Sequence, residues 1–162
     1  MATTTWSSTG STAWNTAGNW SAGVPTVDLD AVFNATSVVN CTLDVDAVCK
    51  TLTMTTGYTG TLAIVTYNMA VVGNSSVAGL VTIGASAGTG WTAVNFTIAA
   101  GGHVTATGAA KVTISGTYDQ ASTTSAFHAS TATITVNGNG TFNADATHDS
   151  TQYNSATLVL NG

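Results

Sequence analysis

Side chains that could do chemistry are few in this sequence, and acidic pairs are the most regular of them. The 162-residue chain has seven Asp, three His, two Lys and two Cys, with no Glu and no Arg. Asp28 and Asp30 are two residues apart, as are Asp44 and Asp46, so in a strand each pair shares one face. With backbone carbonyls, such carboxylates could bind Ca²⁺. We favour the alternative that all four are solvent-facing carboxylates that keep the protein soluble.

The histidines do not form a recognisable catalytic set. His148 and Asp149, with Asp145 nearby, could belong to a metal site or a Ser-His-Asp arrangement, but we interpret them as a polar loop between strands. His103 and His128 are isolated in the sequence. The lack of Arg and Glu removes the usual groups for binding anions and for tuned general acids. We therefore expect neither enzymatic activity nor a cofactor.

Two cysteines, Cys41 and Cys49, lie in strand-like segments eight residues apart. They lack the CxxC spacing and the nearby His that zinc sites use. The favoured interpretation is two small buried thiols, since free Cys is often buried. A disulfide between neighbouring strands is the alternative.

Tryptophans are concentrated near the start of the chain. Trp6, Trp14 and Trp20 lie among Ser, Thr, Asn and Gly, and their large apolar area predicts a cap over the open end of a β core. Trp91 lies in a glycine-rich, turn-like stretch. With Tyr118 it is a candidate contact for a glycan or a protein partner, the alternative being an aromatic packed over the edge of the core.

Composition excludes several classes of protein. Charged residues are 6% of the chain and the net charge is −5, so two lysines cannot neutralise a nucleic-acid backbone. Thr, Ser, Asn and Gly dominate, and these residues form helices poorly. At 44% hydrophobic residues, the chain is not a disordered one, and no apolar run is long enough to cross a bilayer. We expect an all-β protein that binds neither nucleic acid nor membrane.

Short β-branched segments separated by Gly, Asn and Ser predict many short strands. In Val27–Phe33, alternation places Val27, Leu29, Ala31 and Phe33 on the buried face. The other expected strands are Cys41–Val45, Val48–Met54, Thr61–Val65, Met69–Val72, Leu80–Ile83, Val94–Ile98, His103–Ala106, Lys111–Ile114, Thr133–Val136 and Thr157–Leu160.

A four- or five-residue pattern ending in Gly recurs, starting at Val81, Val104, Val112, Ile134 and Leu158. A period in the low twenties predicts a single-domain parallel β-solenoid (β-helix), with inward aliphatic residues, outward ladders of Thr, Ser and Asn, and Gly or Asn at corners with positive φ. We expect a Trp-rich cap and first strand over residues 1–40 and solenoid repeats over 41–162. The rival architecture is a jelly roll or other β-sandwich.

Residues 14–65 carry a resemblance to known families. Asn19-Trp-Ser, Gly23-Val-Pro and Gly57-Tyr-Thr-Gly-Thr-Leu62 resemble the lead-in of autotransporter-associated β-strand repeat proteins and of a group of bacteriophage structural proteins. Autotransporters carry a signal peptide and a long C-terminal barrel, which this sequence lacks, so the phage group is the better match. The resemblance implies a non-enzymatic virion protein, such as a capsid decoration, fibre or tail-associated protein.

The expected setting is a virion or other extracellular particle. Residues Met1–Trp6 have no basic or apolar signal region, so we expect synthesis in the host cytoplasm. Solenoid ends are usually covered, which predicts a homo-oligomer, with a trimer favoured, and contacts with other virion proteins. The alternative function is an adhesin module of a bacterial surface that binds a carbohydrate, such as a host-surface glycan.

Overall fold

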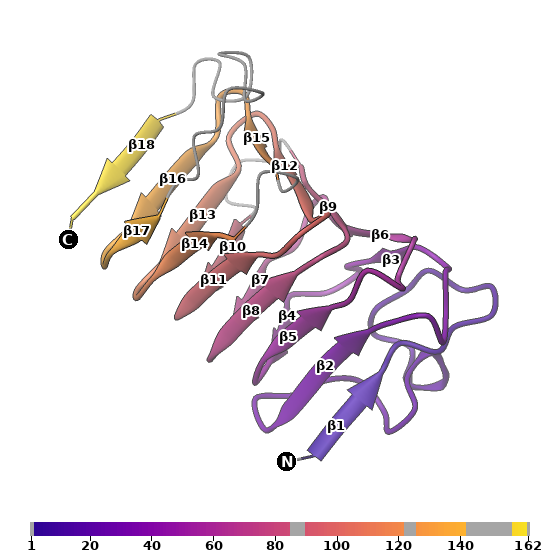
Figure 1. Cartoon of the computed structure of the whole chain (residues 1–162). Helices are drawn as coiled ribbons and strands as arrows, with labels where there is room; N and C mark the ends of the chain where they lie inside the picture. Colours follow the sequence, from indigo (N-terminus) through magenta and orange to yellow (C-terminus); the bar gives the residue numbers. More distant parts are fainter. Residues whose placement is uncertain (1, 85–89, 122–125, 142–156, 162) are drawn as a thin grey trace.

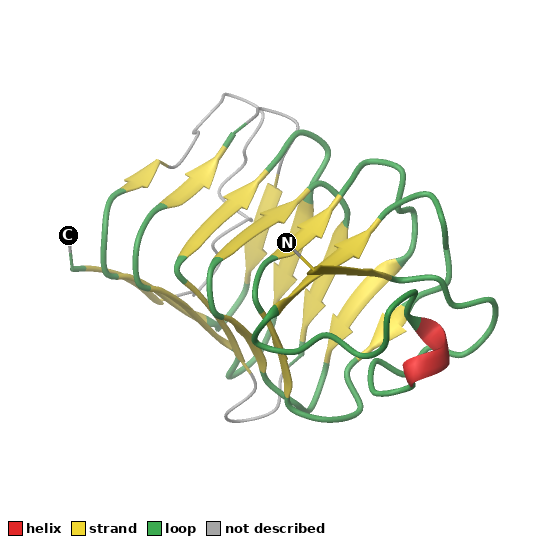
Figure 2. Cartoon of the chain, turned by 90° about the horizontal axis from the view of Figure 1, so that it is seen from below, coloured by secondary structure: helices red, strands yellow, loops and turns green. Residues whose placement is uncertain are grey.

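The computed structural model describes residues 2–84, 90–121, 126–141 and 157–161, and the regular secondary structure in these residues is almost entirely β (Figure 1). Three parallel sheets form the three sides of a β-solenoid. A short 3-10 helix, η1 (Ala17–Asn19), lies beside the N-terminal strands (Figure 2). The predicted parallel β-solenoid is confirmed and the β-sandwich is wrong, because every pairing between named strands in the described residues is parallel.

Each sheet takes one strand from each successive turn. The seven-stranded sheet contains β1 (Ala2–Thr5), β2 (Leu29–Phe33), β5 (Leu52–Met54), β8 (Asn74–Val77), β11 (Asn95–Ile98), β14 (Tyr118–Gln120) and β17 (Gly140–Thr141). The five-stranded sheet contains β3 (Cys41–Thr42), β6 (Thr61–Ile64), β9 (Leu80–Ile83), β12 (His103–Ala106) and β15 (Ala126–Ala129). The six-stranded sheet contains β4 (Ala47–Cys49), β7 (Met69–Val71), β10 (Gly90–Ala93), β13 (Lys111–Ile114), β16 (Thr133–Val136) and β18 (Thr157–Leu160).

Five successive turns, from β2–β4 to β14–β16, build the solenoid core. Strand residues alternate between buried and more exposed, as the two-residue period of a strand requires. Inward residues of successive turns therefore stack on one another in columns. In the five-stranded sheet the column is Cys41, Leu62, Val81, Val104 and Phe127, none more than 1% exposed.

The recurring pattern found in the sequence occupies two sheets rather than one. Val81 and Val104 are in β9 and β12, whereas Val112, Ile134 and Leu158 are in β13, β16 and β18. The predicted period is confirmed within each sheet, because Val81 pairs with Val104, and Val112 pairs with Ile134, in the next turn of the solenoid.

Some strands were not predicted because their inward positions are polar or small. In β8 the inward residues are Ser75 and Val77, and in β14 they are Tyr118 and Gln120. The predicted strand Val48–Met54 is two strands, β4 and β5, because the chain turns a corner at Lys50 and Thr51. Val27 lies before β2 and is 50% exposed, so its predicted burial is wrong.

Residues before β2 form a partial extra layer on the first turn. β1 pairs with β2 in the seven-stranded sheet, and Ala13 forms a parallel bridge with Thr42 in β3. A second bridge, antiparallel, joins Trp6 to Trp20. The N-terminal segment is therefore held by the same backbone pairing as the turns that follow it.

Close contact between turns, more than positive φ, explains the glycines at the corners. Only Gly23, Gly101 and Gly108 have positive φ in the described residues. Gly102 lies where an added Cβ would collide with the Val77 carbonyl oxygen and come within 2.9 Å of Ile98 Cγ2. The expectation that corner glycines serve mainly for positive φ is wrong for Gly102, because neighbouring turns approach too closely for a side chain.

We predict that Gly102→Ala lowers the free energy of unfolding by about 1–3 kcal/mol, because the backbone must shift to admit the methyl group. Urea denaturation followed by circular dichroism measures the change. Gly10→Ala is the matched control, since no atom lies within 4 Å of its added Cβ. Equal stability of the two variants would show that the turns are not packed this closely at Gly102.

Candidate functional site

Asp44 and Asp46 connect the first turn to its two neighbours. Asp44 bonds to the N-terminal segment, and Asp46 bonds to the second turn. They lie in the bend between β3 and β4, so the prediction that they share one strand face is wrong. Asp44 Oδ1 accepts a hydrogen bond from the Asn15 backbone N–H at 2.9 Å. Asp46 Oδ1 accepts from the Asn68 backbone N–H at 2.8 Å and from its Nδ2 at 3.2 Å. Each carboxylate therefore satisfies backbone donors at a corner.

Asp28 and Asp30 differ in environment although they are two residues apart. Asp28 is exposed just before β2, as predicted. Asp30 lies on the outer side of β2, between β1 and β5, and is only 8% exposed. Its Oδ1 accepts a 2.8 Å hydrogen bond from Thr51 Oγ1, so the prediction of a solvent-facing carboxylate is wrong for Asp30. In the part of the chain that the structure describes, no three His, Cys, Asp or Glu side chains gather as metal ligands.

Cys41 and Cys49 are free thiols that point into the core from β3 and β4. Burial, with a smaller contribution from the Asp30 carboxylate, raises the pKa of Cys49 to about 12. Burial and, secondarily, Asp44 also raise the pKa of Cys41. The favoured prediction of buried thiols is confirmed, and the disulfide alternative is wrong. Because only the thiolate is nucleophilic, neither residue is a reactive cysteine at neutral pH.

Trp6, Trp14 and Trp20 gather on Phe33, an inward residue of the first turn. Their indole rings are at most 4% exposed, and the Trp14–Trp20 and Trp6–Trp20 ring centroids are 4.7 Å and 5.1 Å apart. All three rings lie within 5.5–6.2 Å of the Phe33 ring. The Trp6 and Trp20 indole N–H groups donate to carbonyl oxygens at 2.9 Å and 2.8 Å. This arrangement covers the N-terminal side of the core, as expected of a cap.

Trp91 and Tyr118 are buried, at 1% and 2% exposed, so their predicted contact with a glycan or partner is wrong. Trp91 lies in β10, where its Nε1 donates to Ser75 Oγ at 3.3 Å. Its ring centroid is 5.0 Å from that of Phe96. The neighbouring Gly90 marks a close approach, since an added Cβ would lie 2.8 Å from the Lys111 carbonyl oxygen. Glycine next to Trp91 therefore indicates a crowded strand, not an exposed turn.

A column of polar side chains runs along one outer edge of the seven-stranded sheet. We call Asp30, Thr51, Asn74, Asn95 and Thr117 the corner ladder, because they occupy equivalent positions in five successive turns. Asn95 Nδ2 donates to Asn74 Oδ1 at 2.8 Å. Asn95 Oδ1 accepts from the Thr117 backbone N–H at 2.8 Å and from Thr117 Oγ1 at 2.9 Å.

A second polar contact of this kind joins later turns. Asn161 Nδ2 donates to Asn137 Oδ1 at 2.8 Å. The predicted outward ladders of Thr, Ser and Asn are confirmed at these positions, where Asn and Thr side chains hydrogen-bond from one turn to the next. In the corner ladder, the sequence signal was a polar residue recurring at the start of the strands of one sheet with the period of the turn.

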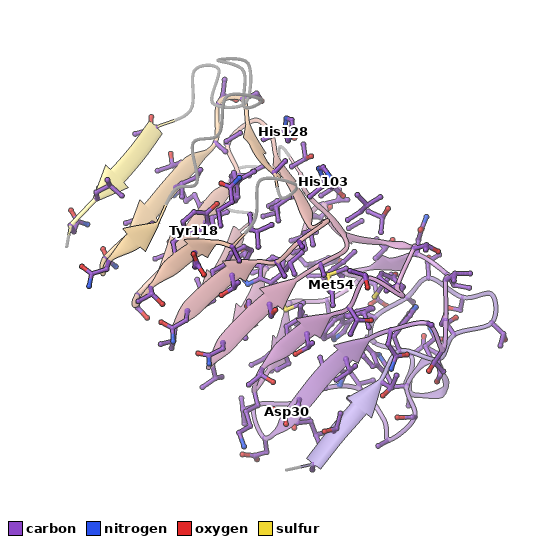
Figure 3. The ribbon with its side chains drawn as sticks, in the orientation of Figure 1. Asp30, Met54, His103, Tyr118 and His128 are labelled. Carbon is purple, nitrogen blue, oxygen red and sulfur yellow. The ribbon has the colours of Figure 1, made fainter. Side chains whose placement is uncertain are left out.

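The structure brings His103 and His128 onto neighbouring strands of the five-stranded sheet, so their description as isolated holds for the sequence only. Both side chains are exposed on the outer face of the sheet (Figure 3). The cluster of Asp145, His148 and Asp149 lies outside the described residues. No helix in the described part of the chain is long and apolar enough to span a membrane.

The raised pKa of Cys49 predicts a loss of stability in alkali. The protonated thiol favours the folded state, so its contribution is intact below pH 9 and falls as the pH rises from 9 towards 12. From pH 7.5 to pH 10, wild type should lose about 1 kcal/mol more unfolding free energy than Cys49→Ala. Urea denaturation at both pH values measures this difference. Equal losses would contradict the prediction.

Asn95→Ala should lower the unfolding free energy by about 1–3 kcal/mol, because Thr117 loses its acceptor and Asn74 loses its donor. Chemical denaturation at pH 7.5 measures the effect. Asn15→Ala is the control: its side chain is exposed, and the variant keeps the backbone N–H that Asp44 accepts, so we expect a change within about 0.5 kcal/mol. If both substitutions are neutral, the corner ladder does not stabilise the fold.

The chain matches no protein-family model, no curated protein sequence and no solved structure.

Proposed function

We propose that this protein is a non-enzymatic structural component of a bacteriophage virion, acting as a capsid decoration, fibre or tail-associated protein. The observation that carries the proposal is the use of polar side chains between turns. Asp30, Asp44, Asp46 and Asn95 all accept hydrogen bonds from a neighbouring layer. These hydrogen bonds connect successive turns of the solenoid. A rigid solenoid suits a structural component of a particle.

Surface chemistry also supports a role outside the cell. With no Arg and two Lys in the whole chain, the surface presents few sites for trypsin-like proteases and few charges that change with pH. Outward strand positions carry Thr instead, as in Thr92, Thr113 and Thr135 on the six-stranded sheet. A particle that persists in the environment benefits from both properties.

Assembly with other chains is the means by which such a rod would act. In the described residues, β18 pairs only with β16, and Leu160 on β18 is 56% exposed. An exposed apolar side chain of this kind can pack against the surface of another subunit. A homotrimer bound to other virion proteins is the assembly that we propose.

Trp91 and Tyr118 were the candidate contacts named for the carbohydrate-binding alternative. Both are buried in the core, so that version of the adhesin hypothesis has lost its proposed contacts. An adhesin remains distinguishable by location, because it would stay with the bacterial envelope.

Fractionation of a phage-producing source culture tests the proposed function. Antibodies raised against the recombinant chain should label purified virions in a density gradient, and immunogold should decorate their exterior. Recovery of the chain only with the cell envelope would support the adhesin, and recovery only as free protein would overturn both. Light scattering of the purified chain should give three times the monomer mass of 16.1 kDa, and a strict monomer would overturn the trimer.

A further inference from the structure

Two histidines that are far apart in the sequence occupy adjacent turns of one face. His103 is the first residue of β12, and His128 is the third residue of β15. In the parallel pairing of these strands, His103 is opposite Ala126 and His128 is opposite Thr105. The two histidines are therefore diagonal neighbours. Both project from the outer side of the five-stranded sheet (Figure 3).

The spacing of a parallel sheet brings diagonal imidazoles within reach of one ion. Neighbouring strands are about 4.8 Å apart and each residue advances about 3.3 Å, which separates the two Cα atoms by about 8 Å. Diagonal pairs at this separation can be bridged by aromatic and other long side chains. A tetrahedral ion with metal–nitrogen distances of about 2.0–2.1 Å requires the two ring nitrogens about 3.3 Å apart. Two imidazoles that lean towards each other satisfy this requirement.

The residues around the pair favour that leaning. The residues directly opposite the two histidines are Ala126 and Thr105, and both have short side chains. On the opposite side of His103, the paired residue on β9 is Leu80, which is 44% exposed and occupies the space there. Among the described outward residues beside His103, the short side chains are therefore on the β15 side, towards His128.

Local charge also suits a cation. The outward positions of β6, β9, β12 and β15 are Thr61, Ala63, Leu80, Thr82, His103, Thr105, Ala126 and His128. They include no Lys and no other titratable group besides the two histidines. The imidazole nitrogen is a good ligand for Zn²⁺, Ni²⁺ and Cu²⁺.

We infer that His103 and His128 chelate a divalent transition-metal ion on the outer face of the five-stranded sheet. Water fills the remaining coordination positions. Because the two ligands come together only through the pairing of β12 with β15, the ion binds the folded chain and links two successive turns.

Titration calorimetry of the untagged chain with ZnCl₂ at pH 7.5 tests the inference. We expect one Zn²⁺ ion to bind wild type at least tenfold more tightly than it binds His103→Ala or His128→Ala. The decisive control is the double variant His128→Thr with Ser115→His, which moves one imidazole to an exposed position after β13 and keeps the number of histidines constant. His148 is retained in every variant, so any contribution from it is common to all.

Thermal unfolding provides a second readout. Saturating ZnCl₂ should raise the melting temperature of wild type and leave that of the relocated-histidine variant unchanged. Circular dichroism without metal establishes that each variant is folded. The inference is overturned if wild type does not bind Zn²⁺, or if the relocated-histidine variant binds it as tightly as wild type.

Discussion

Backbone hydrogen bonding between successive turns is the constraint on which the rest of this structure depends. Parallel strands of neighbouring turns lie about 4.8 Å apart, so each side chain has an equivalent residue directly above and below it. Inward positions must therefore stack apolar groups on apolar groups, as in the column from Cys41 to Phe127. Outward positions must stack side chains that do not repel one another or that form hydrogen bonds with one another. Short neutral side chains meet that condition in every turn, whereas stacked like charges would repel.

This constraint explains how far the sequence could predict the fold. Strands such as Lys111–Ile114 and Thr133–Val136 were predicted with correct bounds because both of their inward residues are aliphatic. β8 was missed because its inward Ser75 looks like a loop residue. Ser75 is buried because it accepts the indole N–H of Trp91, a partner on another sheet of the same turn. A contact of this kind follows from the closed cross-section of the solenoid and leaves no periodic signal in the sequence.

The candidate site residues illustrate the same limit. The burial of Cys41 and Cys49 was predicted correctly, because free Cys is often buried and their strand-like segments were recognisable. The two-residue spacing of Asp44 and Asp46 was misleading, because the chain bends between β3 and β4 and the two carboxylates face different layers. His103 and His128 could not be paired without the register of β12 and β15. That register depends on the length of the corners between the strands, and single-residue differences there decide which outward side chains meet.

Turn length itself varies while the strands stay in register. The turn that brings Val81 onto Leu62 is shorter than the turn that brings Ser75 onto Leu52. The corners absorb the difference, and each turn contacts only its immediate neighbours. Gain or loss of one whole turn would therefore leave the remaining column contacts intact. Each added turn would lengthen the solenoid by about 4.8 Å, the spacing of neighbouring strands. In evolution, duplication of the sequence of one turn would therefore lengthen the solenoid without requiring a new core.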